Sequence, residues 1–472
     1  MAETGQSFIK KFVGFSLVTW VSFAISFLAA PISTRLFDPS VLGKINIFST
    51  YTNFAGIFVL LGLDQAYARF FNERPCAQSV KYLFTFCVSI TYSLVLLFVI
   101  VSIPIRGKLS YTIFQEEDNL LLWLFFISVF CSSTLRYLNL TYRMEQNIKM
   151  YTIQGILITL ASKVLYISVG FWDPSYKPAL VVLTLSHLAL AVFFLGVQRN
   201  RFEIIKKVDR PFAKELFKFA IPLLPVTILS WANSSIPQIV MQRYMDYYSI
   251  GIFTSAMSLA NLILIVQSGF NTFWVPYVYE NYKEQTGQFY KVQRYLLCAL
   301  TIVALLIIST QDVIFLILGE KYRAAKTFFP FLMLTPICYL IGETSGVGID
   351  ISKKTYLNLY VFGASVLTNF VLCVILQKWM GVEGIAVAVS VSAIVAMVLK
   401  TFLGEKYYHM LENPRQILFT ITIIVSAAIA TLLTTNSYLR EIIVLCLLIS
   451  TCFYYRREIS ELYQYGLTFL RK

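Results

Sequence analysis

The residues best suited to chemistry in this chain are ionisable side chains that interrupt long apolar runs. Lys163 lies in the middle of the run LITLASKVLYISVG, and Arg136 lies within SSTLRYLNL. A charge inside an apolar segment is expensive and usually faces a hydrated cavity or a partner, so we expect both residues to contact an anion. The alternative for Lys163 is a lysine that snorkels or pairs with an acid, and for Arg136 an anchor near the cytoplasm.

Acidic residues occupy similar places in the sequence. Glu343 lies within LIGETSGVGI, and Asp64 and Arg69 bracket the end of another apolar run in FVLLGLDQAYARFF. We expect these three residues to act in coupling or gating, with simple pairing to a basic neighbour as the alternative for Glu343. His187 is one of only two histidines, and we expect it to be a hydrogen-bonded interior residue. The sequence therefore predicts neither a metal site nor a cofactor.

One motif, Arg-x-x-Asp-x4-Gly, occurs twice at an offset of 208 residues. The two copies are Arg35, Asp38 and Gly43, and Arg243, Asp246 and Gly251. An aspartate followed by proline, as at Asp38, is typical of a helix N-cap, so we expect the aspartates to cap helices and the glycines to pack closely. The two arginines could equally line the outer mouth of a cavity.

Apolar runs long enough to cross a membrane must position these residues. A spanning helix needs roughly 20 apolar residues. We expect 14 such helices, near 10–33, 41–63, 79–104, 119–141, 151–172, 178–197, 219–240, 249–275, 293–318, 327–350, 356–377, 382–403, 415–435 and 437–455. The strand-length alternation of a membrane barrel is absent, so the predicted fold is an all-α integral membrane protein.

The motif repeat and a polar segment divide the expected spans. We predict an N-lobe at 1–200 with six spans, a cytoplasmic linker at 201–218, a C-lobe at 219–410 with six spans, and a final helix pair with a cytoplasmic tail at 411–472. Because each lobe has an even number of spans, the two copies should share one orientation in the membrane.

The composition agrees with a membrane protein. Of 472 residues, 57% are hydrophobic and only 14% are charged, with a mean hydropathy of +0.69. These values exclude a disordered chain, a disulfide scaffold and an ordinary cytosolic enzyme. The 39 basic residues concentrate in the connections on the side of the N-terminus, which predicts that both termini are cytoplasmic. The net charge of +14 therefore needs no nucleic-acid partner.

Motifs for catalysis are missing from the sequence. It contains no GxxxxGK[ST], HExxH or GxSxG pattern, and its eight cysteines form no CxxC pair. No connection is long enough for a soluble catalytic domain. We therefore expect a transporter and not an enzyme.

Several segments resemble the polysaccharide flippases of the Wzx type. They are PISTRLFDPSVLGKINIFSTY, FVLLGLDQAYARFF, FKFAIPLLPVTILSWANSS, SIGIFTSAMSLANLILIVQSGFNTFWVPYVYE and ISKKT. These flippases belong to one superfamily with the multidrug (MATE) exporters and the bacterial lipid II flippase. Where many relatives place an Asp-Arg pair in the seventh span, this chain has Ser-Ile-Pro-Gln at 235–238, so no charged pair is carried over there.

The resemblance implies a multi-pass protein of the bacterial inner membrane, with two six-helix lobes in a V around a central cavity. Its cargo would be an undecaprenyl-pyrophosphate-linked oligosaccharide, moved to the outer leaflet by alternating access for O-antigen, capsule or exopolysaccharide synthesis. Lys163, Arg136, Arg35 and Arg243 would attract the pyrophosphate. Besides the bilayer and this lipid, a polysaccharide polymerase and a chain-length regulator are candidate partners.

Two other functions compete with this expectation. A cation-coupled multidrug exporter of the same fold should have an acid-rich cavity, whereas buried bases are at least as numerous here. A membrane glycan polymerase or ligase should need a large outer loop.

Overall fold

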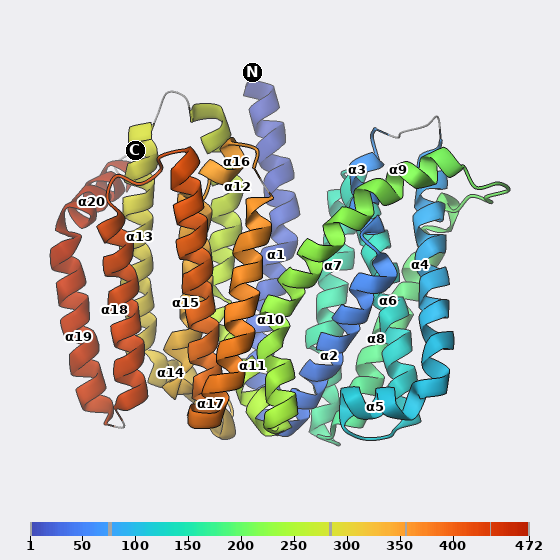
Figure 1. Ribbon diagram of the computed structural model, residues 1–472, viewed down its shortest axis with the longest axis horizontal. Helices are drawn as coiled ribbons and strands as arrows, with labels where there is room; N and C mark the ends of the chain where they lie inside the picture. The colour runs from blue at the N-terminus through green and yellow to red at the C-terminus, as the bar shows by residue number, and fades with distance from the viewer. Residues whose placement is uncertain (1, 74–77, 283–285, 355, 435, 471–472) are drawn as a thin grey trace. The chain divides into compact units, whose positions relative to one another are not determined.

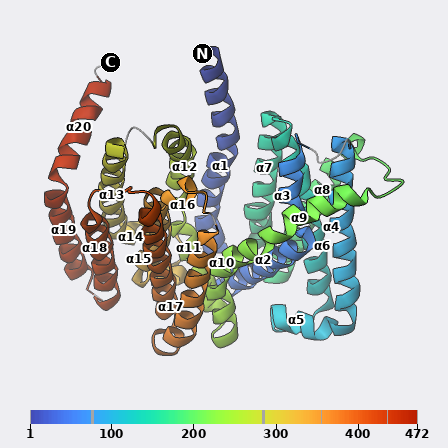
Figure 2. The ribbon, with the colours of Figure 1, turned by 45° about the horizontal axis from the view of Figure 1, so that its top comes forward.

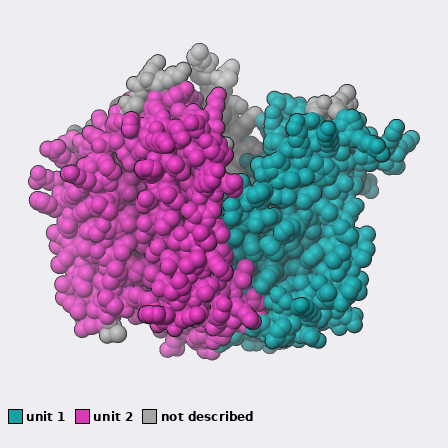
Figure 3. Space-filling model, viewed as in Figure 1, with its two compact units in different colours: residues 1–235 teal, residues 236–472 magenta. Residues whose placement is uncertain are grey.

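The computed structural model describes residues 2–73, 78–282, 286–354, 356–434 and 436–470. Within these ranges the protein is 87% helix with no strand, as the apolar runs predict. The chain forms two compact units, Met1–Ser235 and Ile236–Lys472, which Figure 3 shows in different colours. The boundary falls inside one helix, beyond the linker expected at 201–218. The finer division expected at 410/411 stays a prediction.

Unit 1 is a bundle of long helices joined by short helical turns. Its elements are α1 (Ala2–Leu36), α2 (Pro39–Leu60), α3 (Leu63–Phe70), α4 (Val80–Ser102), η1 (Ile103–Ile105), α5 (Arg106–Phe114), α6 (Asn119–Met144), α7 (Ile148–Lys163), η2 (Leu165–Phe171), α8 (Tyr176–Val197), η3 (Arg199–Arg201), α9 (Arg210–Ala220), η4 (Ile221–Leu223) and the first part of α10 (Leu224–Tyr244). Within this unit, α5 lies at one end of the bundle and α3 and α9 lie at the other (Figures 1 and 2).

The short helix α9 is amphipathic and closes one end of unit 1. Its Phe212, Leu216 and Ala220 are completely buried in the main hydrophobic core of the unit. The Phe212 ring meets the Tyr82 ring edge to face at 5.4 Å. Burial of one apolar face explains why this stretch of the polar segment 198–218 is a helix packed on α3 and not a free linker.

Helices α1 and α7 pack closely where a glycine of α7 leaves room for a valine of α1. A Cβ on Gly155 of α7 would lie 2.6 Å from Cγ1 of Val18. Nearby, the hydroxyls of Ser22 and Thr159 form a hydrogen bond of 2.7 Å. Small residues and interhelical hydroxyl bonds are typical of membrane helices, where water supplies no hydrophobic driving force.

Unit 2 contains the remaining helices. They are the rest of α10, then α11 (Tyr247–Ala260), α12 (Ile263–Asn281), α13 (Thr286–Ser309), α14 (Gln311–Ile317), η5 (Glu320–Thr327), α15 (Phe329–Ser345), α16 (Gly348–Ile351), α17 (Leu357–Tyr407), α18 (Pro414–Leu433), α19 (Ser437–Tyr454) and α20 (Arg456–Leu470). The 51-residue α17 contains a kink at Gly381, whose φ of 60° and ψ of −132° are not helical. The two expected spans 356–377 and 382–403 meet at this kink.

Counted by helix length and apolar composition, the spans are fewer than the 14 expected from the sequence. Among the described residues, nine helices are long and apolar enough to cross a membrane, or up to eleven if each of two bent helix pairs forms one span. The kinked α17 counts once among the nine. The exact count of 14 is therefore not confirmed, whereas a multi-pass membrane protein is.

The repeated motif has the capping role that its sequence predicts. The Asp38 carboxylate accepts a hydrogen bond of 3.0 Å from the backbone N–H of Ser40, and α2 begins at Pro39. In unit 2, the Asp246 carboxylate accepts a bond of 2.9 Å from the N–H of Ser249 at the start of α11. Each aspartate thus satisfies one of the free N–H groups of a helix N-terminus.

Candidate functional site

Asp64 and Arg136, which lie 72 residues apart in sequence, form an ion pair in unit 1. Arg136 donates from Nη2 at 2.8 Å and from Nε at 3.1 Å to the same oxygen, Oδ2 of Asp64. The side chain of Asp64 is 8% exposed, whereas that of Arg136 is 53% exposed. A buried acid thus holds a half-exposed guanidinium in place.

A sharp bend in the chain brings Asp64 to this position. Leu61 and Gly62 both have positive φ values, 50° and 72°, and the axes of α2 and α3 differ by 55°. Asp64 therefore lies in the first turn of α3, where a negative charge is favourable. Gln65 donates a further hydrogen bond of 3.0 Å to Oδ2 of Asp64.

The guanidinium of Arg136 keeps donors for a ligand. Its Nη1 has no acceptor among the residues that the structure describes, and the side chain as a whole is half-exposed. Guanidinium groups bind phosphate oxygens through parallel N–H bonds. The arrangement is thus able to hold an anion while Asp64 fixes the orientation of Arg136.

Lys163 is the last residue of α7, where the α-helix gives way to the 3-10 helix η2. Its side chain is exposed, and no hydrogen bond or ion pair joins it to any part of the chain that the structure describes. One turn earlier on the same face, Thr159 contacts α1. A 3-10 stretch within a membrane helix often marks a hinge. Lys163 is therefore a cation without a protein counter-charge in the described ranges.

His187 of α8 is held by two hydrogen bonds, one of them to the residue before Lys163. Its Nε2 lies 3.0 Å from Oγ of Ser162, and its Nδ1 lies 2.7 Å from the carbonyl oxygen of Leu183. This bonding has the character expected of an interior histidine. Among the described residues, no group of histidine, cysteine and acidic side chains could hold a metal ion.

A second ion pair, largely shielded from solvent, lies in unit 2 and joins Glu343 of α15 to Lys400 of α17. Nζ of Lys400 lies 2.5 Å from Oε1 of Glu343, and the two side chains are only 19% and 20% exposed, respectively. The sequence predicts a role for Glu343 but does not identify Lys400 as its partner. Lys400 lies near the end of an expected span, where lysines normally reach the headgroups, and only its ionisable character inside the run could have indicated it.

The other predicted residues lie at the helix ends. Arg35 and Arg243 occupy the last turns of α1 and α10, each with an exposed side chain. Arg69 forms an ion pair of 2.7 Å with Glu73, and both side chains are largely exposed. Asp64 and Arg69 thus have different partners, although they lie in the same short helix.

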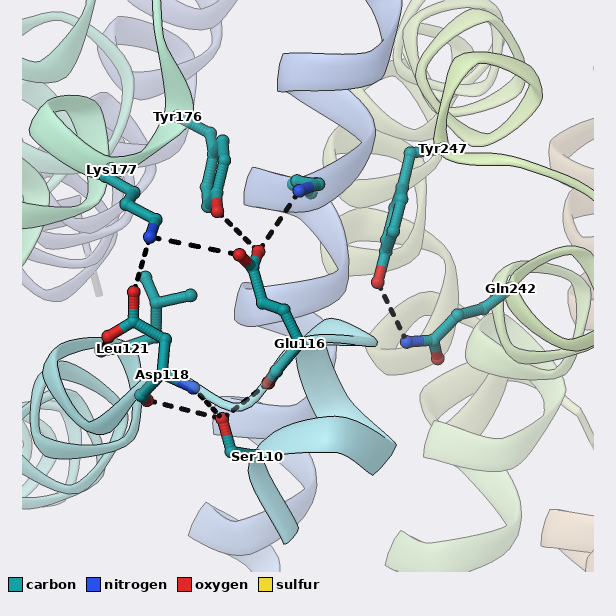
Figure 4. Close-up of polar contacts among 9 residues, drawn as sticks. Ser110, Glu116, Asp118, Leu121, Tyr176, Lys177, Gln242 and Tyr247 are labelled. Carbon is teal, nitrogen blue, oxygen red and sulfur yellow. Dashed lines mark hydrogen bonds and ion pairs between the residues drawn. The ribbon is translucent and has the colours of Figure 1, made fainter. Parts of the chain in front are cut away.

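A polar cluster fastens the end of unit 1 that is opposite α3. It joins the start of α2, helix α5, the connection between α5 and α6, and the start of α8, and Figure 4 shows most of its side chains. Its members, called here the Glu116 cluster, are Lys44, Ser110, Glu116, Asp118, Tyr176 and Lys177. In Figure 4 a separate bond of 3.4 Å joins Gln242 to Tyr247 in unit 2.

The charges of the Glu116 cluster favour its ionised acids. Lys44 lies 3.1 Å from Glu116, and Lys177 lies 2.5 Å from Asp118. Burial acts to raise the pKa of Glu116, but hydrogen bonds from Tyr176 and Lys44 and the two ammonium charges lower it below its usual value. The hydrogen bond from Lys177 lowers the pKa of Asp118, and backbone N–H groups of α6 add to this effect. The Glu116 cluster therefore stabilises the contacts between these helices and is not an open binding site.

Comparisons with known proteins identify the fold and the family. The family described as polysaccharide biosynthesis protein matches residues 32–327. A solved structure of the lipid II flippase MurJ in an inward closed conformation is similar, with a TM-score of 0.70 and 14% identity over 94% of this chain and 99% of that chain. No curated protein matches the sequence.

Multidrug transporters share the fold at lower similarity. An inward-facing MATE family transporter of the MOP superfamily has a TM-score of 0.57 and 15% identity over 81% of this chain and 94% of that chain. The MATE multidrug transporter DinF-BH has a TM-score of 0.57 and 13% identity over 85% and 97%. At these identities the structures show the fold, and the family match covers more than half of the chain. The protein is therefore a member of the polysaccharide biosynthesis protein family, with the fold that MurJ and the MATE transporters share.

Proposed function

We propose that the protein is a flippase that moves an undecaprenyl-pyrophosphate-linked oligosaccharide across the bacterial inner membrane for the synthesis of a surface polysaccharide. Membership of the polysaccharide biosynthesis family and a fold shared with a lipid II flippase support a lipid-linked cargo. Transport proceeds by alternating access, in which the anion-binding residues open to one side of the membrane at a time. The protein is not an enzyme in this proposal.

One observation carries the proposal: Arg136 is charged, half-exposed and held by Asp64 within an apolar helix. A cation in an apolar segment is tolerated where a cavity or partner stabilises it. A pyrophosphate presents several oxygens to the free edge of the guanidinium, and a poorly screened site strengthens the attraction. The pair is thus suited to bind a diphosphate without becoming an uncompensated buried charge.

Lys163 is the second anion-binding residue of unit 1 in this proposal. Its ammonium has no protein counter-charge among the described residues, so a bound phosphate gains attraction without first breaking an ion pair. Arg35 and Arg243, at the ends of their helices, attract the same group as it enters or leaves. The polyprenyl chain stays in lipid and needs no specific residue.

Gating uses the acidic residues. When a diphosphate binds the free edge of Arg136, its charge competes with that of Asp64 for the same guanidinium, so binding weakens the contact between α3 and α6. Glu343 and Lys400 form the corresponding gating pair in unit 2, and Arg69 adjusts the end of α3. Both termini lie in the cytoplasm in this proposal, and a polymerase and a chain-length regulator act on the exported lipid.

A cation-coupled multidrug exporter of the same fold is the main alternative, because two MATE structures are similar. Such an exporter needs an acid that is available to a proton or a sodium ion. In the described ranges, both Asp64 and Glu343 are already paired with a base. This pairing favours an anionic cargo over a cationic one.

Surface polysaccharide display tests the proposal. Arg136→Ala and Lys163→Ala, expressed at wild-type level in a deletion strain, should each reduce display strongly, and the double variant should abolish it. Lys214→Ala is a matched control, because it removes one positive charge from an exposed position of α9. Unchanged display in both single variants would remove these residues from the site, and drug sensitivity of the deletion strain with normal display would favour the multidrug exporter.

A further inference from the structure

The Glu343–Lys400 pair lies at a helix crossing that is lined by glycines. A second acid is close enough to be affected by this pair, because the charges of both Lys400 and Glu343 act on the carboxyl of Asp350 in α16. Its ammonium also lies 6.0 Å from the centre of the Tyr339 ring. To reach Glu343, the long side chain of Lys400 must pass between the two packed helices.

The missing side chains of two glycines at the end of α15 leave room for this passage. A Cβ built on Gly346 would lie 2.5 Å from Cγ and 3.0 Å from Cε of Lys400. One turn earlier, a Cβ on Gly342 would lie 3.6 Å from Cδ of Lys400, which is an ordinary contact. The aliphatic part of Lys400 therefore fills the space that a side chain at Gly346 would occupy.

The backbones are already in close contact at this crossing. A Cβ on Gly348 would lie 2.1 Å from the carbonyl oxygen of Gly404, so the two backbones are in direct contact one turn beyond Lys400. The hydroxyls of Ser345 and Thr401 form a further bond of 2.6 Å between the helices. A Cβ added at Gly346 would meet both Lys400 and the carbonyl oxygen of Gly342, and of the two the Lys400 side chain is the one that can move without displacing backbone.

We propose that Gly346 is a positioning residue for the Glu343–Lys400 ion pair: the absence of its side chain keeps open the path along which Lys400 reaches Glu343. With any larger residue at 346, the ammonium leaves Glu343, and the acids Glu343 and Asp350 lose their counter-charge inside the membrane. The inference rests on the proposed function only in assigning this pair to gating.

The test is a double-mutant cycle on the purified full-length protein in detergent micelles, with the thermal unfolding midpoint as the readout. Gly346→Ala is compared in the wild-type and the Glu343→Gln backgrounds. Steric strain from the new Cβ lowers the midpoint equally in the two backgrounds. This strain includes the contact of 2.6 Å between the new Cβ and the carbonyl oxygen of Gly342. Loss of the ion pair lowers the midpoint only in the wild-type background, because Glu343→Gln has already removed the pair.

The expected result is a larger fall of the midpoint in the wild-type background than in the Glu343→Gln background. Gly342→Ala, which adds the same atom one turn earlier, within α15, should change the midpoint little. Equal falls in the two backgrounds would overturn the proposal, because Gly346 would then serve packing alone. If Gly346→Ala does not fold, Glu343→Gln/Lys400→Ala/Gly346→Ala, which removes the blocking side chain together with the acid that depends on it, should restore folding, and failure to do so would also overturn the proposal.

Polysaccharide display separates this inference from the proposed function. If the cycle shows coupling and Gly346→Ala also reduces display, the positioned pair gates export. If the cycle shows coupling while display is normal, Gly346 positions the pair, but the pair does not gate transport. The positioning role of Gly346 and the gating role of the pair can therefore be contradicted separately.

Discussion

Two N–H groups of Arg136 converge on one oxygen of Asp64, Oδ2, at 2.8 and 3.1 Å. The second oxygen of this carboxylate and Nη1 of Arg136 remain outside the pair. The contact is therefore one-sided: it orients the guanidinium and leaves an edge for another acceptor. This geometry suits an arginine that binds a ligand phosphate while a protein carboxylate holds it in place.

Asp64→Asn keeps the shape of the side chain and removes its charge. We expect polysaccharide export to fall roughly tenfold, which corresponds to the loss of one charge-assisted hydrogen bond. Arg136→Lys should cause a similar loss, because lysine keeps the charge but lacks the planar fork. Display on whole cells at matched expression measures both. Wild-type display in Arg136→Lys would show that charge alone suffices.

Substitution of Lys163 should reduce export without lowering the stability of the protein. Because Lys163 has no partner among the described residues, Lys163→Gln should change the free energy of unfolding by less than about 0.5 kcal/mol. Export should nevertheless fall, and Lys163→Arg should keep most of it. Thermal unfolding and display of the same preparations check this pattern. A large loss of stability in Lys163→Gln would indicate a structural role.

The Glu116 cluster should make the protein sensitive to acid. The pKa values of Glu116 and Asp118 are both lowered in the folded state. Such acids stabilise the fold above their usual pKa values, near 4, and this stabilisation is lost as the pH falls through the lowered folded-state values. The thermal midpoint of the wild type should therefore drop between about pH 5 and pH 2, where these acids take up protons.

A double variant, Glu116→Gln/Asp118→Asn, provides the comparison for the acid series. It should start from a lower midpoint at neutral pH and show a shallower fall on acidification, because fewer protons are taken up on unfolding. Parallel curves for the variant and the wild type would contradict the assignment of this acid sensitivity to the Glu116 cluster.

The bend between α2 and α3 should depend on Gly62. Its φ of 72° is disfavoured for other residues by about 1–2 kcal/mol. An added Cβ would also lie 2.6 Å from the carbonyl oxygen of Ala220. Gly62→Ala should therefore lower the thermal midpoint and export together. Gly56→Ala in α2, where a Cβ meets nothing within 4 Å, is the matched control and should be neutral or stabilising.

Local signals predicted much of the fold. Asp38 and Asp246 were recognisable as caps because capping depends on a side chain and its own next residues. The apolar runs predicted an all-helical membrane protein because burial in lipid demands it. The break of α7 at Lys163 and the joining of two expected spans in α17 depend on packing, and no local pattern indicates them.

The candidate site was predictable in its residues but not in its pairs. Asp64, Arg136 and Glu343 stand out because charges inside apolar runs are costly. Their partners come from residues 72 and 57 positions away in the sequence, a separation that only the fold brings together. Lys400 was missed for this reason, and Gly346 has meaning only once the path of Lys400 is known.

The most direct test of the central claim is translocation by the purified protein in liposomes. The probe is an undecaprenyl-pyrophosphate-linked oligosaccharide, and its sugar is detected at the outer leaflet by a lectin or an impermeant oxidant. The proposal predicts that the wild type moves the lipid across the bilayer, that Arg136→Ala/Lys163→Ala does not, and that Lys214→Ala behaves as the wild type. Translocation by the double variant at the wild-type rate would contradict the proposed anion site, and no translocation by the folded wild type would contradict the flippase itself.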